Sequence, residues 1–360
     1  MALAHRSGPA SNEFPNTLYF HSQSSLCYCL TAGLVNGFRL NPTGRPHTLP
    51  LASDESRCPK VCPKCVAMTS SNLQIDHITV AGSSLEALRH CLNNAGLPTE
   101  YGGAHSNGVT HMDVAGLPDG SYLELISSIS AVAEPSLFWS EHIRQNGGPC
   151  AWAVRAFDIR SEIERLRRNS IPIGDARMFH RERPDGARVE WLLAFPGEEP
   201  PGATLPFLIE DITPRDLRVR PTPAIAELGE DSSSPVVLRG VARVVLSVKD
   251  LRVATELFRQ AYDWPAPHTW GDRFVAFPGT PVILDCPPRN ARSLRERLEA
   301  FGNSPRAFLI AVDSLDAACR HFPLSSPENW LDLRVAWLDV SVLHELFGAW
   351  SHESLGFVEV

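Results

Sequence analysis

The sequence has no surplus of positive charge. Its 33 Lys and Arg residues stand against 41 Asp and Glu residues, so the 360-residue chain carries a formal net charge of −8 at pH 7. Such a chain has no general attraction to nucleic acid or to an anionic membrane surface. We therefore expect neither nucleic acid nor membrane as a partner.

Long hydrophobic runs are also missing. The apolar run from Leu26 to Val35 is much shorter than the roughly 20 residues of a bilayer-spanning helix. Residues 1–71 are rich in Ser, Pro, Gly and Asn and show no sustained periodicity, so we expect a disordered or transit-like N-terminal extension. Glu13 is the only acid in the first fifty residues, which faintly resembles a transit peptide. Alternatively, the working protein starts at Met68.

Cysteines are few in the part of the chain where apolar residues recur with the spacing of helices and strands. Of nine in total, five precede residue 70, and their spacing offers no evident fourth ligand for a zinc ion. The other four have apolar neighbours and are expected to be buried free thiols in a reducing compartment. We expect a cytoplasmic protein, or a mitochondrial one if the extension is a transit peptide. These four are Cys91, Cys150, Cys286 and Cys319.

A repeat with a shift of 74 residues organises the next part of the chain. Residues 83–98 match residues 157–172 without a gap, and both copies keep an apolar helix face that ends at a proline. In each copy an apolar, strand-like run precedes the helix and another follows it. These runs are residues 75–80 and 122–126 in the first copy, and 150–154 and 205–210 in the second. The pattern predicts two strand–helix–strands units.

Two degenerate copies of the same pattern follow. The third has a first strand at 241–248, a helical stripe from Leu251 to Ala261 and a fourth strand at 282–285. The fourth copy is predicted to have its first strand at 307–312, its helix at 315–321 and its fourth strand at 335–339, ending in Asp339. Neither copy has a histidine on its first strand.

A chain of 360 residues exceeds the usual size of a single core, so we expect two domains. The stretch 221–235 contains Pro-Thr-Pro and a Ser-rich acidic segment, which is typical of a linker. The predicted organisation is an extension over 1–71, a first domain over 72–220, a linker over 221–235 and a degenerate second domain over 236–360.

The strands of the first two copies resemble a known family. His77 in Asp-His-Ile, Glu124 in Leu-Glu-Leu and Glu210 in Leu-Ile-Glu are similar to the metal-ligand strands of the vicinal oxygen chelate superfamily, which includes glyoxalase I, extradiol dioxygenases and bleomycin-resistance proteins. The glyoxalase-like branch is the more similar, because its Gly-Thr-His is matched by residues 109–111, which end in His111. The resemblance covers residues 73–214 well and continues more weakly to the C-terminus.

The resemblance implies an α+β fold of tandem βαβββ modules that form two half-open mixed-sheet barrels, the second degenerate. In the superfamily the first and fourth strands of each module supply the metal ligands. The resemblance thus implies a divalent ion, such as zinc, iron, manganese or nickel, on His77, Glu124 and Glu210. The shift of 74 places Ala151 where the second module would carry a histidine, so the usual four-ligand set is incomplete.

Roles for further residues follow from the same resemblance. Glu210 is the candidate base, because its ligation is the weaker, and His111 is a candidate fourth ligand, general base or surface histidine. If His77 faces the barrel interior, strand alternation places Ile75 and Thr79 on the same face. Candidate substrate contacts are Tyr122, Trp152, Arg155 and Trp191.

Two classes of function remain open. One is a metal-dependent enzyme that acts on a small oxygenated substrate as an isomerase, a lyase or a dioxygenase. The other is a metal-free protein that binds or sequesters a small molecule, as bleomycin-resistance proteins do. Retention of His77, Glu124 and Glu210 favours the first, and Ala151 favours the second. We expect a monomer or a homodimer.

Overall fold

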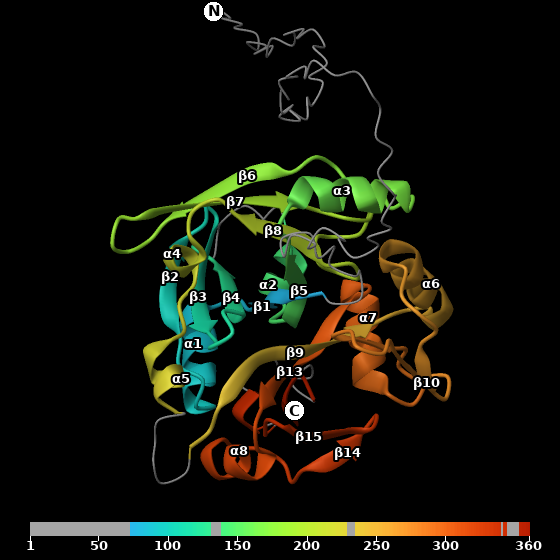
Figure 1. Cartoon of the computed structure of the whole chain (residues 1–360). Helices are drawn as coiled ribbons and strands as arrows, with labels where there is room; N and C mark the ends of the chain where they lie inside the picture. Colours follow the sequence, from blue (N-terminus) through green and yellow to red (C-terminus); the bar gives the residue numbers. More distant parts are fainter. Residues whose placement is uncertain (1–72, 131–137, 229–234, 340, 344–352) are drawn as a thin grey trace, which may run out of the picture. The chain divides into compact units, whose positions relative to one another are not determined.

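The computed structural model describes residues 73–130, 138–228, 235–339, 341–343 and 353–360. The predicted N-terminal extension and its five cysteines lie outside these residues. The described chain consists of four βαβββ modules in two 8-stranded mixed sheets (Figure 1). The predicted fold class is therefore confirmed.

The first sheet contains the first two modules in the order β2-β3-β4-β1-β5-β8-β7-β6. In each module the first strand runs parallel to the fourth, and β1 and β5 join the modules in antiparallel pairing. The elements are β1 (Ile75–Ala81), α1 (Leu85–Asn94), β2 (Glu100–Ala104), β3 (Thr110–Gly116), β4 (Tyr122–Ser128), α2 (Ser140–Arg144), β5 (Gly148–Arg155), α3 (Ile159–Arg168), β6 (Arg177–Glu182), β7 (Arg188–Ala194) and β8 (Phe207–Asp211).

The second sheet repeats this order with β10-β11-β12-β9-β13-β16-β15-β14. Two short helices, α4 (Arg215–Arg218) and α5 (Pro223–Glu227), lead into it. Its elements are β9 (Leu238–Ser247), α6 (Leu251–Tyr262), β10 (His268–Trp270), β11 (Phe274–Ala276), β12 (Val282–Asp285), α7 (Arg292–Phe301), β13 (Ser304–Val312), α8 (Leu315–His321), β14 (Glu328–Trp330), β15 (Leu333–Trp337) and β16 (Leu355–Glu359).

The same capping chemistry starts the first helix of every module. A Ser or Asp stands immediately before the helix in an extended conformation, and its side chain accepts a backbone N–H of the first turn. Each N-cap marks the point at which its module passes from the first strand to the helix. The four N-caps therefore show which residues of the four modules occupy equivalent positions. They are Ser84, Asp158, Asp250 and Ser314.

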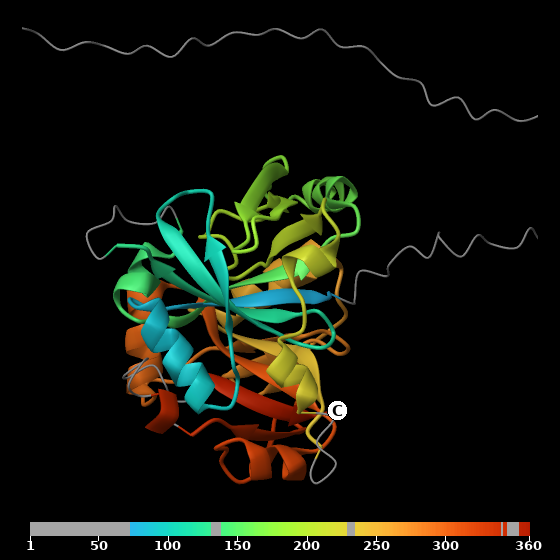
Figure 2. The ribbon, with the colours of Figure 1, turned by 90° about the vertical axis from the view of Figure 1, so that its left-hand side faces the viewer.

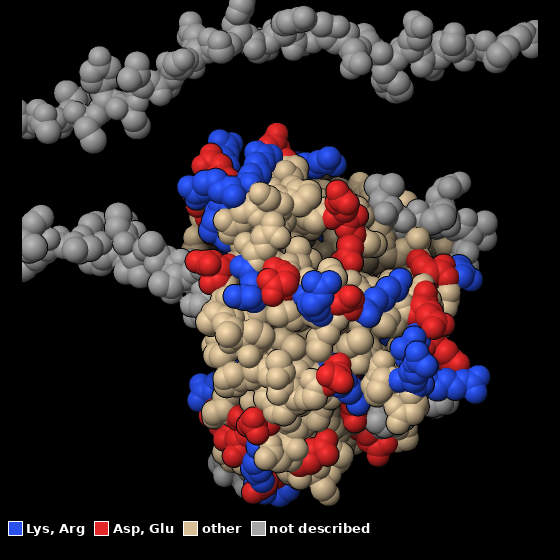
Figure 3. Space-filling model, turned by 90° about the vertical axis from the view of Figure 1, so that its right-hand side faces the viewer, with Lys and Arg blue, Asp and Glu red and all other residues tan. Residues whose placement is uncertain are grey.

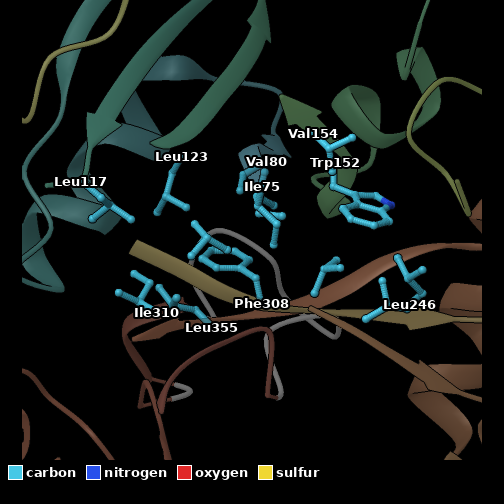
Figure 4. Close-up of a cluster of buried hydrophobic side chains, with 14 of the residues drawn as sticks. Ile75, Val80, Leu117, Leu123, Trp152, Val154, Leu246, Phe308, Ile310 and Leu355 are labelled. Atoms are coloured by element: carbon cyan, nitrogen blue, oxygen red, sulfur yellow. The ribbon is translucent and has the colours of Figure 1, made fainter. Parts of the chain in front are cut away.

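The two sheets share one hydrophobic core. Side chains from β1, β4 and β5 meet side chains from β9, β13 and β16, and Trp152, Phe308 and Ile310 are almost completely buried between them (Figure 4). Ile75 belongs to this inter-sheet cluster, although strand alternation predicted that it would share the face of His77. The reason is a register irregularity of β1 between Ile75 and His77, which shifts the alternation by one residue.

The first sheet closes almost completely on itself. Its edge strands β2 and β6 approach each other, and a guanidinium N–H of Arg181 on β6 donates to the carbonyl of Gly102 on β2. Helix α1 lies between this sheet and the fourth module, where the thiol of Cys91 donates to the carbonyl of Val342 at 3.1 Å (Figure 2). The buried side chains on the inner face of the first sheet form a different cluster from those between the two sheets.

The predicted linker is partly ordered against the first sheet. The hydroxyl of Thr222 accepts the N–H of Gly116 at 2.9 Å, and Ile225 on α5 is 1% exposed within the inter-sheet core. Residues 221–228 therefore pack as part of the fold, whereas residues 229–234 lie outside the described part.

One strand of the fourth module differs from its prediction. Residues 335–339 mostly belong to β15, which is the third strand, and the fourth strand is β16. The acid near the end of the fourth strand is consequently Glu359 and not Asp339. The error arose because β15 and β16 are both short apolar strands, so periodicity alone does not distinguish them.

Cys91, Cys150, Cys286 and Cys319 form no disulfide within the described chain, and the first two are buried. No helix among the described residues is long and apolar enough to cross a membrane. Basic and acidic side chains are interspersed on the face shown in Figure 3.

Candidate active site

A cavity of about 130 Å³ occupies the interior of the first sheet. The apolar part of its wall is mostly aromatic. Its polar groups come from β1, β4, the loop between β2 and β3 and the start of β3, and on the other side from β6 and α4. An apolar pocket with a few converging polar groups is the usual form of a small-molecule site. The aromatic wall consists of Tyr122, Phe138, Trp139, Phe179, Trp191, Phe195 and Phe207.

His77 on β1 and Glu124 on β4 meet in this cavity. The His77 Nε2 atom lies 3.5 Å from Oε2 of Glu124, and the hydroxyl of Thr79 donates to the same oxygen at 3.0 Å. Both side chains are almost completely buried. The ring of Tyr122 stacks on the His77 ring with a centroid distance of 4.6 Å, which holds the imidazole in place.

A second histidine, which the sequence did not single out, completes the polar cluster. His105 Nε2 lies 3.1 Å from Oε1 of Glu124, and its Nδ1 lies 2.8 Å from the hydroxyl of Thr110. Asn107 in turn donates to that hydroxyl at 3.1 Å and fixes the loop between β2 and β3. With a proton on Nε2, His105 donates to Glu124. The Asn-Gly turn at 107–108 was the only local signal for this loop.

Asp76 holds His77 from the side away from the cavity. Its Oδ1 lies 2.7 Å from Nδ1 of His77, and its two oxygens accept hydrogen bonds from Arg215 and Arg218. Burial opposes ionisation of Asp76, but the charge of Arg218 and the His77 hydrogen bond outweigh it, so the pKa of Asp76 lies well below its ordinary value. With Nδ1 of His77 donating to Asp76, Nε2 of His77 faces the cavity.

The family model for the glyoxalase-like domain matches residues 75–262, which is more than half of the chain. The chain belongs to the glyoxalase-like domain family. This family places it in the vicinal oxygen chelate superfamily. No curated protein matches the sequence.

Solved structures provide a comparison of the fold. A hypothetical protein from Staphylococcus aureus superposes with a TM-score of 0.51 at 11% identity, over 80% of this chain and 99% of that one. The Mn(II)-bound glyoxalase from Novosphingobium aromaticivorans gives a TM-score of 0.46 at 8% identity, over 80% of this chain and 82% of that one. At these identities, the first comparison supports the shared fold alone.

The strand register of this glyoxalase-like protein corrects the predicted equivalence of Glu124 and Glu210. The N-caps Ser84 and Asp158 correspond, so Thr79 on β1 corresponds to Ala153 on β5. Thr79 pairs with Glu124, whereas Ala153 pairs with Phe207. Phe207 therefore occupies the position of Glu124.

Glu210 does not reach the cavity. Its carboxylate accepts the backbone N–H of Ile159 at 2.8 Å, at the first residue of α3. Glu359 on β16 accepts the N–H of Leu315 at the start of α8 at the same distance. Glu210 thus satisfies a free N–H at a helix N-terminus, where a negative charge is favourable.

Replacement of Glu210 by alanine is expected to lower the free energy of unfolding by about 1 kcal/mol, because one helix-capping hydrogen bond is lost. Ligand binding in the cavity should not change. Urea unfolding and calorimetric titration of the same preparation check both statements. A loss of ligand affinity with unchanged stability would place Glu210 in the site instead of at the helix.

The remaining candidate residues divide between the cavity and other places. Tyr122 and Trp191 line the cavity. Trp152 is completely buried on the other face of β5, where its indole N–H donates to the carbonyl of Thr204. Arg155 lies outside the cavity and contacts Asp76 at 3.7 Å. His111 packs edge-on against the ring of Tyr101 and is not part of the cavity wall.

The residues of the site do not fit the four-ligand metal set that the resemblance implies. The second module offers Ala151 and Phe207 at the two remaining positions, and neither side chain can bind a metal. The Phe207 ring packs edge-on against His77 with centroids 5.3 Å apart, and both oxygens of Glu124 contact protein donors. Within the described residues, no three His, Cys, Asp or Glu side chains are arranged to hold a metal ion.

At the equivalent positions, the second sheet lacks the histidine–carboxylate pair of the first. In the third module, the N-cap and the strand pairs place Arg243 at the position of His77 and Ile283 at that of Glu124. In the fourth module, Ala307 and Gly356 take these two positions. An apolar cluster that includes Phe274, Trp330 and Trp337 occupies part of the interior of the second sheet. A pocket of about 140 Å³ lies beside Arg243 and Ile283, which replace the histidine and the carboxylate there. The second sheet therefore serves as the packing partner of the first.

The charge on Glu124 makes stability depend on acid pH. Burial raises the pKa of this carboxyl, but hydrogen bonds from His105 and Thr79 and the charge of His77 lower it further, to about 2 from 4.5. A lowered folded-state pKa stabilises the fold above the ordinary pKa, so about 3 kcal/mol is expected to be lost as the pH falls from about 4.5 to about 2.

Urea unfolding at a series of pH values, with wild type beside Glu124→Gln, measures this contribution. The variant lacks the titrating carboxyl, so the stability difference between the two proteins should shrink below pH 4.5. A difference that stays constant from pH 6 to pH 3 would contradict the assignment.

Proposed function

We propose that this glyoxalase-like protein is an enzyme that transfers a proton on a small carbonyl compound bound in the first-sheet cavity, in a reaction of the isomerase or lyase type. The observation that carries the proposal is the buried, ionised Glu124 between His77 and His105 in an aromatic cavity. Buried titratable groups that converge in a cleft are characteristic of acid–base catalysis.

His77 is the proposed base. An imidazole is a usual general base, whereas both oxygens of Glu124 already accept hydrogen bonds, from Thr79 and His105. Asp76 orients the ring through Nδ1, which leaves Nε2 facing the cavity. Glu124 then stabilises the imidazolium that forms, as an anion 3.5 Å from Nε2.

The proposed step is balanced within the substrate and His77. His77 Nε2 takes a proton from the carbon next to the carbonyl, and the C–H electron pair forms the double bond of an enolate. Where the deprotonated carbon carries a hydroxyl group, the imidazolium returns the proton to the former carbonyl carbon. The hydroxyl proton moves to the former carbonyl oxygen, and the carbonyl group has then changed place, which is isomerisation. In a lyase reaction the enolate instead expels a leaving group from the adjacent carbon. The aromatic wall excludes water from the enolate.

The metal dependence expected from the resemblance is not part of this proposal, because the second module supplies Ala151 and Phe207 instead of ligands. The test is deuterium incorporation from D₂O next to the carbonyl of a panel of small aryl and alkyl ketones, aldehydes and 2-oxo acids, followed by proton NMR. Full-length protein is compared before and after chelator treatment, with metal content measured by elemental mass spectrometry. We expect exchange that survives chelation.

Two results would overturn the proposal. Exchange that disappears on chelation and returns with zinc, iron, manganese or nickel would establish the metal-dependent enzyme. Saturable binding of a carbonyl compound without any exchange would establish a binding or sequestering protein. The apolar wall and the loss of two ligand positions favour this second function over a structural role.

A further inference from the structure

Arg181 is a buried cation without an acidic hydrogen-bond partner. It lies on β6, lines the cavity and is 4% exposed. Its two terminal nitrogens donate to backbone carbonyls, those of Gly102 and Arg218, the latter at 2.5 Å. The remaining donor, Nε–H, is buried and has no acceptor within the described structure. A buried donor without an acceptor carries a free-energy cost, which a bound acceptor would remove.

The other charges of the cavity are already compensated. The neighbouring Arg218 donates to Asp76, Asp211 and the hydroxyl of Tyr122. Glu124 accepts from His105 and Thr79. Burial lowers the pKa of the Arg181 guanidinium, which an anion beside it would reverse. Among these cavity groups, Arg181 is the one whose hydrogen bonds all go to backbone carbonyls, and Glu124 acts on it only through space, which offsets burial in part.

The wall beside Arg181 fits a flat apolar group. Phe195 contacts Phe179, Phe138 and Phe207 at centroid distances of 6.3, 5.4 and 5.9 Å, and Trp139 lies 6.3 Å from Phe207. Aromatic rings at these spacings bind another ring by edge or offset contacts. The cavity therefore combines an apolar space lined by aromatic rings with a buried guanidinium N–H that has no acceptor within the described structure.

We infer that the ligand of this cavity is a small aromatic carboxylate, with the carboxylate bound by Arg181 and the ring held among the phenylalanines. The inference rests on the proposed function only in assigning the ligand to the same site. A guanidinium recognises a carboxylate by charge-assisted hydrogen bonds, which are stronger than those to a neutral amide.

The test is calorimetric titration of full-length protein with phenylacetate and with phenylacetamide. The two probes have nearly the same shape, and only the first is charged at pH 7. We expect phenylacetate to bind at least about tenfold more tightly. Arg181→Met should bring the two affinities within about twofold of each other and leave the amide affinity almost unchanged. Arg181→Lys should restore part of the preference.

Arg183→Met is the matched control. Arg183 is on the adjacent turn, donates to the carbonyl of Leu217 at 2.7 Å and pairs with Asp185, but it does not line the cavity. This variant should keep the wild-type preference. Equal binding of both probes by wild type, a preference that survives Arg181→Met, or no binding of either probe at millimolar concentration would each overturn the inference.

Failure of this inference is distinguishable from failure of the proposed function. His77→Gln should lower the rate of proton exchange by about 10²–10⁴-fold while keeping the preference for the carboxylate probe. If exchange is found on neutral ketones and the carboxylate is not preferred, the enzyme stands and the Arg181 assignment falls. If the carboxylate is preferred and nothing exchanges, the binding protein stands with Arg181 as its anchor. Thermal unfolding of each Arg181 variant separates loss of binding from loss of fold.

Discussion

Replacing Asp76 by asparagine is expected to lower the free energy of unfolding by about 3–5 kcal/mol. The carboxylate is completely buried and accepts hydrogen bonds from Arg215, Arg218 and His77. An amide keeps the shape but removes the negative charge, so buried Arg218 loses one of its two acidic partners. The cost is mainly that of a guanidinium left insufficiently compensated in the protein interior.

Urea unfolding of wild type and Asp76→Asn measures this loss. Asp175→Asn is the control, because its side chain is 90% exposed and its ion pair with Arg167 is on the surface. Such a pair contributes about 0–1 kcal/mol. If the free energy of unfolding fell by a similar amount in the two variants, the buried network around Asp76 would not be the interaction that stabilises the packing of α4 on β1.

The repeat in the sequence predicted the fold because it reflects local chemistry. Helix periodicity, the apolar first strands and the capping residues all lie within short windows, and each module forms the same pairing of its own first and fourth strands. Four such modules then determine two sheets. The inter-sheet cluster around Trp152 could not be predicted in this way, because it joins residues that are far apart in sequence.

The site was predicted less completely because it depends on register. Residues 195–206 connect β7 to β8, whereas residues 117–121 connect β3 to β4, so the 74-residue shift no longer holds at the fourth strand. An acid near the end of β8 then looked like the partner of Glu124, although Phe207 has that place. In a strand, a small register error moves a side chain to the other face.

His105 and Arg218, which lie around His77, were missed for a related reason. His105 lies on a loop whose path depends on the Asn107–Thr110 hydrogen bonds, and Arg218 reaches Asp76 from a helix far along the chain. Neither arginines on short helices nor histidines in loops have a periodic signature. Only the folded chain brings them together around His77.

His77→Gln is expected to lower the rate of proton exchange by 10²–10⁴-fold, the usual contribution of a positioned general base. Glutamine can still accept a hydrogen bond in the cavity but cannot take up a proton. The rate is measured from deuterium incorporation under saturating substrate, beside ligand affinity from calorimetry. A large fall in rate with an affinity within about threefold of wild type would identify His77 as acting in the chemical step.

His111→Gln provides the control for this measurement. It removes an imidazole from β3, in the same module but outside the cavity wall, so exchange should stay within about twofold of wild type. If His111→Gln instead caused the large fall and His77→Gln did not, the base would have to reach the substrate from the outer face of β3. That result would also make the Asp76 network a purely structural device, because its hydrogen bond to His77 would then orient no catalytic group.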